Sequence, residues 1–126
     1  MKLVISIMVL VVFIIGSATV FYFYSATIHE ELHDIIEKIE EAALEDDWEK
    51  VNRKNDSLQE LWSKGDALWT PVIDHKEVDR VDEAITRIDA LSYLCLRDEL
   101  LVEVVTARRL ISRLQDNEKP TLQSIF

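Results

Sequence analysis

The hydrophobic positions of this chain follow two different patterns. Residues 3–24 carry no charged side chain and are almost wholly apolar, whereas apolar residues beyond Thr27 recur at steps of three and four. At about 1.5 Å per residue, a helix of these 22 residues is roughly 33 Å long, enough for the ~30 Å hydrocarbon core of a bilayer. The first pattern predicts a transmembrane helix ending in interfacial aromatic residues, and the second predicts amphipathic helices.

The first two amphipathic stripes predict a helical hairpin. The first stripe predicts a helix over residues 25–44, and because no Gly or Pro separates it from the apolar segment 3–24, one continuous helix through both is allowed. The second stripe predicts a helix over residues 47–68, with Asp46 and Glu49 in capping-box spacing at its start. Pro71 bars its continuation.

The remaining stripes predict a second hairpin. The third helix is expected to open at Asp74, with Glu77 three residues further on. A turn is expected near residues 96–98, with Asp98 as the N-cap of the fourth helix. Pro120 is expected to end that helix.

The predicted fold class is all-α: an N-terminal transmembrane helix followed by a small antiparallel helical bundle of two helical hairpins. Short links make neighbouring helices antiparallel, which supports the hairpin arrangement. The expected organisation is a short cytoplasmic N-terminus (1–2), a transmembrane helix (3–24), an acidic extracytoplasmic bundle (25–119) and a short C-terminal tail (120–126).

Charges on either side of the apolar segment predict its orientation. Lys2 and the α-amino group precede it, whereas Glu30, Glu31 and Asp34 follow it before the next Lys. The positive-inside rule then places the N-terminus in the cytoplasm and the bundle outside a cell membrane. The small residues 16–18 also fit a cleavage site, so a cleaved signal peptide is the alternative; it leaves the bundle on the same side.

Charge and composition exclude several classes of function. The formal net charge is −10, whereas nucleic-acid binding needs a basic face, so no nucleic-acid partner is expected. A single Cys cannot build a disulfide framework or an all-thiolate zinc site. The sequence has no Gly-rich phosphate loop and no nucleophile elbow, and no cofactor is expected.

One stretch has the spacing of a zinc-hydrolase motif. His29, Glu30 and His33 form H-E-x-x-H on an expected helix, where the two histidines share a face and the Glu can act as a general base. A catalytic zinc needs a third protein ligand, and no further His follows at the spacing of the extended motif. We interpret both histidines as polar positions flanking the apolar stripe, without a catalytic or metal role, and keep a zinc-dependent hydrolase as the alternative.

A candidate interaction surface lies around the turn between the second and third helices, although a helix start is the favoured interpretation of its charged residues. Asp74, His75, Lys76 and Glu77 form a dense charged block that fits a helix start and also an exposed recognition turn. Trp69 lies in the preceding loop and is expected to be partly exposed.

Other conspicuous residues are expected to belong to the core. Trp48, Trp62 and Trp69 are spaced by 14 and 7 residues, so a core role on one heptad face is favoured over ligand stacking. Asn55 interrupts the second stripe and is expected to fix helix register. Cys95 falls on the third stripe and is expected to be buried; if it were exposed outside the cytoplasm, an intermolecular disulfide would be open to it.

Several blocks of the sequence resemble a known family. The blocks are Asp47-Trp48-Glu49-Lys50, Trp69 shortly before Asp74-His75-Lys76-Glu77-Val78-Asp79, Glu118-Lys119, and Thr121-Leu122 with Ile125-Phe126. With the apolar segment, they are similar over nearly the whole chain to domain of unknown function 4363, a group of small bacterial single-span membrane proteins found mainly in Firmicutes. The resemblance implies no known activity, cofactor or catalytic residue.

These observations favour a non-enzymatic, membrane-anchored helical module for protein–protein interaction or scaffolding at the bacterial cell envelope. A protein partner is expected, and self-association is also open. A third class, besides the zinc hydrolase, is a sensory ectodomain that binds Ca²⁺ or Mg²⁺ through its acids, although the sequence has no EF-hand spacing.

Overall fold

The computed structural model describes the backbone of residues 1–71 and 73–125 and the side chains of residues 1–71 and 73–116. Within these ranges the chain forms four helices and no strand, which confirms the all-α fold class. The helices are α1 (Lys2–Leu44), α2 (Trp48–Trp69), α3 (His75–Leu94) and α4 (Arg97–Ile125).

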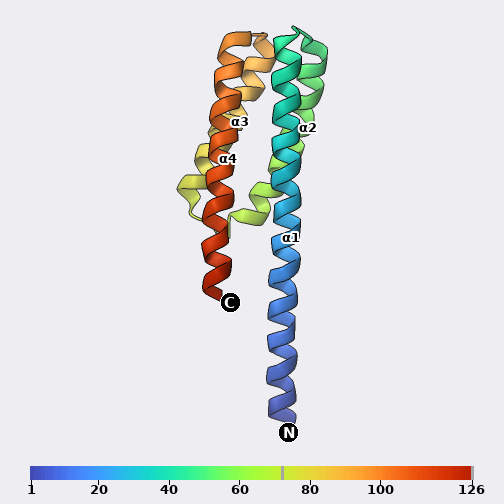
Figure 1. The fold of residues 1–126 in the computed structure, drawn as a ribbon, viewed down its shortest axis with the longest axis vertical. Coiled ribbons are helices and arrows are strands. Elements are labelled where there is room, and N and C mark those ends of the chain that lie inside the picture. Colours follow the sequence, from blue (N-terminus) through green and yellow to red (C-terminus); the bar gives the residue numbers. More distant parts are fainter. Residues whose placement is uncertain (72, 126) are drawn as a thin grey trace.

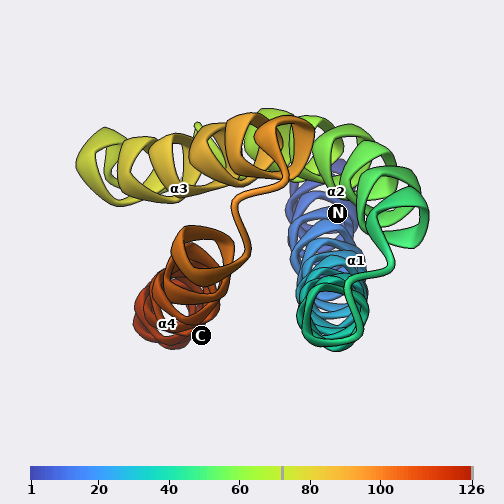
Figure 2. The same ribbon diagram turned by 90° about the horizontal axis from the view of Figure 1, so that it is seen from above.

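Helix α1 is continuous from the apolar segment into the bundle, as the absence of Gly and Pro near residue 25 allows. Its first half extends alone beyond the other helices, and its second half packs with them (Figure 1). The four helices run alternately up and down, and each contacts its two neighbours in the ring α1–α2–α3–α4. Seen from above, α1 and α4 are viewed nearly end-on, whereas α2 and α3 are inclined to them (Figure 2).

The core is formed by the apolar stripes that the sequence pattern predicts. Leu32, Ile36 and Ile39 of α1 are fully buried, as are Val51 and Leu58 of α2. The inner faces of α3 and α4 add Val78, Val81, Ile85, Ile88, Leu100, Val104, Ile111 and Leu114. Each such side chain contributes about 1.5–3 kcal/mol relative to an exposed one, so this core holds the two hairpins together.

A polar network ties α2 to α3 across the core. Asn55 is 2% exposed and its Nδ2 donates to Asp89 Oδ1 at 2.7 Å. Gln59 Nε2 donates to Asn55 Oδ1 at 3.1 Å and to the Ile85 carbonyl at 3.0 Å. Because these bonds are satisfied in only one alignment of α2 and α3, they fix the register expected of a polar residue in an apolar stripe.

The α1–α2 turn is closed by a residue in the left-handed conformation. Asp46 has φ 56°, and the amides of Asp46 and Asp47 donate to the carbonyls of Ala43 and Ala42 at 3.1 and 2.9 Å. This is a Schellman motif, which satisfies the last carbonyls of α1 without a glycine. The predicted cap is wrong by one residue, because the left-handed turn leaves Asp47 to cap α2 through the Lys50 amide at 3.2 Å.

The α3–α4 turn uses the same motif and corrects the prediction for Cys95. Cys95 has φ 55°, and the Leu96 amide donates to the Leu91 carbonyl at 3.1 Å. The thiol is exposed rather than buried, because the left-handed residue points out of the turn. Helix α4 begins at Arg97, so Asp98 lies in its first turn instead of capping it.

Replacing Cys95 with glycine is expected to raise the free energy of unfolding by about 1 kcal/mol, because glycine relieves the left-handed backbone. Urea titration of the full-length protein in detergent measures this change. Cys95→Ala is the matched control, since its Cβ retains the strain. Equal midpoints for the two variants would contradict the explanation.

Helix α4 continues through Pro120 to Ile125, so the prediction that Pro120 ends the helix is wrong. Proline fixes φ near −65°, which is a helical value, but within a helix it loses one backbone hydrogen bond and its ring crowds the carbonyl four residues earlier. The predicted tail is therefore helical in its backbone as far as Ile125.

Candidate functional site

A tightly packed cluster joins the bundle to the apolar segment of α1. We call Ser25, His29, Gly65 and Trp69 the junction cluster. Trp69 is fully buried, its indole Nε1 donates to Ser25 Oγ at 2.8 Å, and its ring stacks on the His29 imidazole with centroids 4.6 Å apart. Gly65 leaves room for the indole, because a Cβ at this position would lie 2.6 Å from Trp69 Cζ3.

The junction cluster changes the interpretation of the H-E-x-x-H stretch. His29 is 1% exposed and packs on Trp69, so it is a core residue rather than a polar flank of the stripe. Glu30 is exposed, and His33 is half-buried. Among the side chains that the structure describes, no group of three or more His, Cys, Asp or Glu is placed to hold a metal ion. The geometry gives the zinc-hydrolase alternative no support.

The interaction surface predicted around the α2–α3 turn is only partly an outer surface. Asp74, His75 and Lys76 are exposed and Glu77 is half-buried, but Trp69 is fully buried, which corrects its expected exposure. Asp74 caps α3 by accepting from the Lys76 amide at 3.0 Å, as predicted. The charged block therefore starts a helix, while the Trp beside it packs inward because Ser25 and His29 provide its partners.

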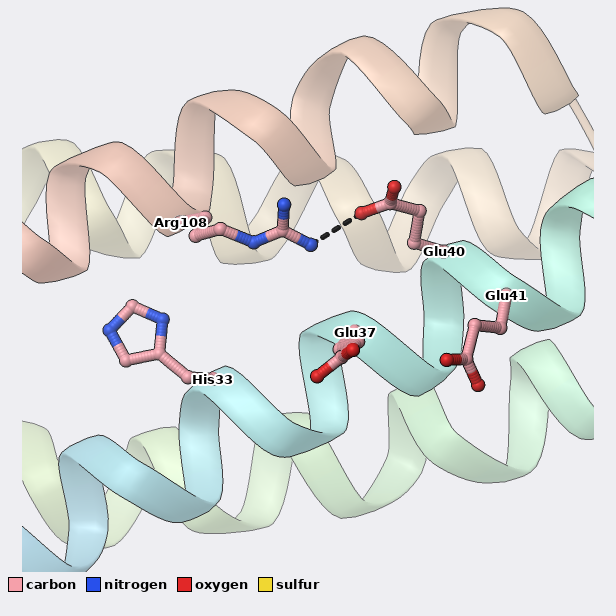
Figure 3. A pocket seen from close by; sticks show the side chains of 5 residues that line it. All are labelled: His33, Glu37, Glu40, Glu41 and Arg108. Atoms are coloured by element: carbon pink, nitrogen blue, oxygen red, sulfur yellow. Dashed lines mark hydrogen bonds and ion pairs between the residues drawn. The ribbon is translucent and has the colours of Figure 1, made fainter.

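A second polar site lies between α1 and α4. His33, Glu37, Glu40 and Glu41 of α1 and Arg108 of α4 line a groove of about 440 Å³, which we call the acidic groove (Figure 3). Arg108 donates to Glu40 across the groove and forms an ion pair with it. This pair ties α4 to α1, and it leaves the rest of the groove with an excess of negative charge.

The surroundings of His33 disfavour its protonated form. Burial lowers the pKa of the His33 imidazole below its ordinary value of 6.5, and the charges of His29 and Arg108 lower it further. The nearby Glu side chains do not reverse this direction. His33 is therefore held neutral within the groove at neutral pH.

This lowered pKa predicts a pH-dependent stability. Because unfolded His33 binds a proton more readily than folded His33, the stability is full above pH 6.5 and falls as the pH drops through the lowered folded pKa. His33→Gln is expected to reduce the loss of unfolding free energy between about pH 7.5 and pH 5. Urea titrations of the full-length protein at several pH values measure it. His75→Gln, at an exposed histidine, is the control, and an unchanged pH slope in His33→Gln would refute the assignment.

The end of the bundle farthest from the N-terminus exposes large apolar side chains. Leu44, Tyr93, Leu94 and Leu96, which we call the distal tip, are 57%, 83%, 59% and 41% exposed. They flank the α1–α2 and α3–α4 turns, which lie at the same end of the molecule (Figure 1) and are linked by an Arg97–Asp46 ion pair at 3.4 Å. These exposed apolar side chains at one end of the bundle make the distal tip a candidate contact surface.

Comparison with known proteins identifies the family. The model of a domain of unknown function, DUF4363, matches residues 19–125. The chain belongs to the DUF4363 family. No curated protein and no solved structure matches this DUF4363 protein.

The blocks that carried the resemblance have structural roles in this DUF4363 protein. Asp47 and Asp74 cap α2 and α3, and Trp69 belongs to the junction cluster. Trp48 is half-buried against the core. The side chains of the two C-terminal blocks, Glu118-Lys119 and residues 121–126, lie outside the described residues.

Sequence reasoning missed two parts of the candidate sites. Arg108 was not singled out, because its partner Glu40 lies 68 residues away along the chain. The distal tip was missed because Leu94 lies off the apolar face of the third stripe and Leu96 lies in the expected turn, and no surface was assigned to either position. The signal in the sequence that could have indicated this surface was the presence of large apolar residues beside the expected turn.

Proposed function

We propose that this DUF4363 protein is a non-enzymatic, membrane-anchored helical module that mediates protein–protein interaction or scaffolding at the bacterial cell envelope. The apolar segment 3–24 anchors it, and the distal tip contacts a protein partner. The acidic groove and the junction cluster are structural: the first holds α4 on α1, and the second holds the bundle on the anchor.

The observation that carries the proposal is an apolar helix that the fold does not bury. The most apolar part of α1 has a mean hydropathy of 2.8, and none of it is buried against the rest of the chain. Residues 3–24 are exposed except for the half-buried Ala18 and Phe21. A soluble fold would leave this surface in water at a cost of about 25 cal/mol per Å², so a bilayer is its natural environment.

The charges beside this segment support an orientation with the bundle outside the cytoplasm. Lys2 precedes the segment, while Glu30, Glu31 and Asp34 are all exposed after it. The positive-inside rule then places the N-terminus in the cytoplasm. The distal tip in this arrangement is the part of the bundle farthest from the bilayer, where a partner in the envelope has access to it.

Site-specific photo-crosslinking in cells tests the proposal. A photoreactive residue at Tyr93 of the distal tip is expected to give a reproducible adduct with an envelope protein in the membrane fraction. The same residue at Thr86, exposed on α3 and away from the tip, is the matched control. An adduct with a second copy of this chain would identify the partner as the protein itself, so that the interaction is self-association.

Two outcomes would overturn the proposal. Release of the full-length protein into the soluble fraction without detergent would show that residues 3–24 do not anchor it in a membrane. Equal crosslinking from positions 93 and 86 would show that the distal tip is not the surface that contacts the partner.

A further inference from the structure

The α2–α3 turn is held at the height where the apolar segment ends. The indole of Trp69, the last residue of α2, donates to Ser25 Oγ at 2.8 Å, and Ser25 directly follows Tyr24. The turn lies beside the middle of α1, at the base of the packed part of the bundle (Figure 1). It therefore lies within about one helical turn, or ~5 Å, of the end of the apolar segment.

The composition of this turn differs from that of the rest of the bundle. Residues 67–73 read Ala-Leu-Trp-Thr-Pro-Val-Ile and carry no charge, in a chain of which 30% is charged. Ala67 and Pro71 are exposed and Leu68 is half-buried, so part of this apolar surface points outward. Of the charged residues beside it, Lys76 is attracted by anionic headgroups, whereas Asp66, Asp74 and Glu77 are repelled by them, so contact with a bilayer depends on the apolar surface of the turn.

The turn and the apolar segment border the same apolar groove. Leu68 of α2 forms one wall of a groove of about 570 Å³, and the other walls belong to α1. These walls are Phe13, Gly16, Ser17, Val20, Phe21 and Tyr24. All of the α1 residues lie within the segment assigned to the membrane, so the groove opens to the hydrocarbon region and not to water.

From this placement we infer that the α2–α3 turn is a second membrane contact: residues 67–71 and Ile73 lie in the headgroup layer, and a phospholipid acyl chain fills the groove below Leu68. The inference rests on the proposed anchoring of residues 3–24. The polar layer on each side of the hydrocarbon core is roughly 5–7 Å deep, so a turn fixed beside Ser25, at the end of the apolar segment, lies at this layer. Two contacts restrict the tilt of the bundle relative to the bilayer.

Fluorescence of a single label in liposomes tests the inference. In a Cys95→Ser background, Ala67→Cys carries an environment-sensitive fluorophore, and the full-length protein is reconstituted in phosphatidylcholine and phosphatidylglycerol vesicles. The label is expected to shift to shorter wavelength and to be quenched several-fold more by lipids with a nitroxide high on the acyl chain than the same label at Thr86→Cys. Both positions are exposed in the fold, so neither substitution removes a buried contact.

A third label at Val9→Cys, exposed within the apolar segment, separates the possible failures. Quenching at Val9 together with a Thr86-like response at Ala67 would overturn the second contact while the anchor stands. A water-like response at Val9 would overturn the anchor and the inference together. Protection of Ala67 from water without lipid quenching, accompanied by crosslinking to a second copy, would assign the groove to a helix of another chain and also overturn the inference.

Discussion

Replacing Trp69 with alanine is expected to lower the free energy of unfolding of the bundle by about 3–5 kcal/mol, the largest effect of any single substitution considered for this protein. The indole is fully buried, stacks on His29, contacts Trp62 with ring centroids 5.6 Å apart, and donates to Ser25. Its removal leaves a cavity and an unpartnered surface where α2 meets α1. Urea titration in detergent, followed by the helical circular dichroism signal, measures the loss.

Two matched variants separate the contributions of Trp69. Trp48→Ala removes a half-buried indole on the same helix and is expected to cost less. Trp69→Phe keeps an aromatic ring against His29 but loses the hydrogen bond to Ser25, a bond worth about 1 kcal/mol. An equal effect of alanine at Trp48 and Trp69 would contradict the central role given to the junction cluster.

The sequence predicted the helices well because their information is local. Each stripe repeats at steps of three and four, and one buried face follows directly from that spacing. The predicted range 47–68 and the observed α2 (Trp48–Trp69) differ by one residue at each end. Asp74 was recognised as a cap because its side-chain partner lies only two residues away.

The turns were predicted less well because their conformation has no strong local signal here. Schellman turns commonly carry glycine, whereas this chain places Asp46 and Cys95 in the left-handed position. Cys95 follows the apolar period of α3, so periodicity alone assigns it to the core. Pro120 was read as a helix end, although its fixed φ is compatible with a helix.

The junction cluster was beyond sequence reasoning because its contacts are between distant residues. Trp69 and Ser25 are 44 residues apart along the chain, and neither residue carries a motif that points to the other. The spacing of His29 and His33 suggested a metal pair, but spacing on one helix does not reveal that the indole of another helix covers His29. A buried histidine beside a tryptophan is a tertiary property, visible only when α1 and α2 are packed together.

Replacing Gly65 with alanine is expected to destabilise the bundle by about 1–2 kcal/mol, although alanine alone favours a helix by about 1 kcal/mol over glycine. The new Cβ would lie 2.6 Å from Trp69 Cζ3 and 3.3 Å from Ile28 Cγ2, and the indole cannot retreat because His29 and Ser25 hold it from other sides. Gly16→Ala is the control, since a Cβ there meets nothing within 4 Å. If the indole causes the clash, Gly65→Ala should cost less unfolding free energy in a Trp69→Phe background than in the original protein. The losses of Gly65→Ala and Trp69→Phe would then not add in the double variant. Additive losses would show that Gly65 acts through another contact.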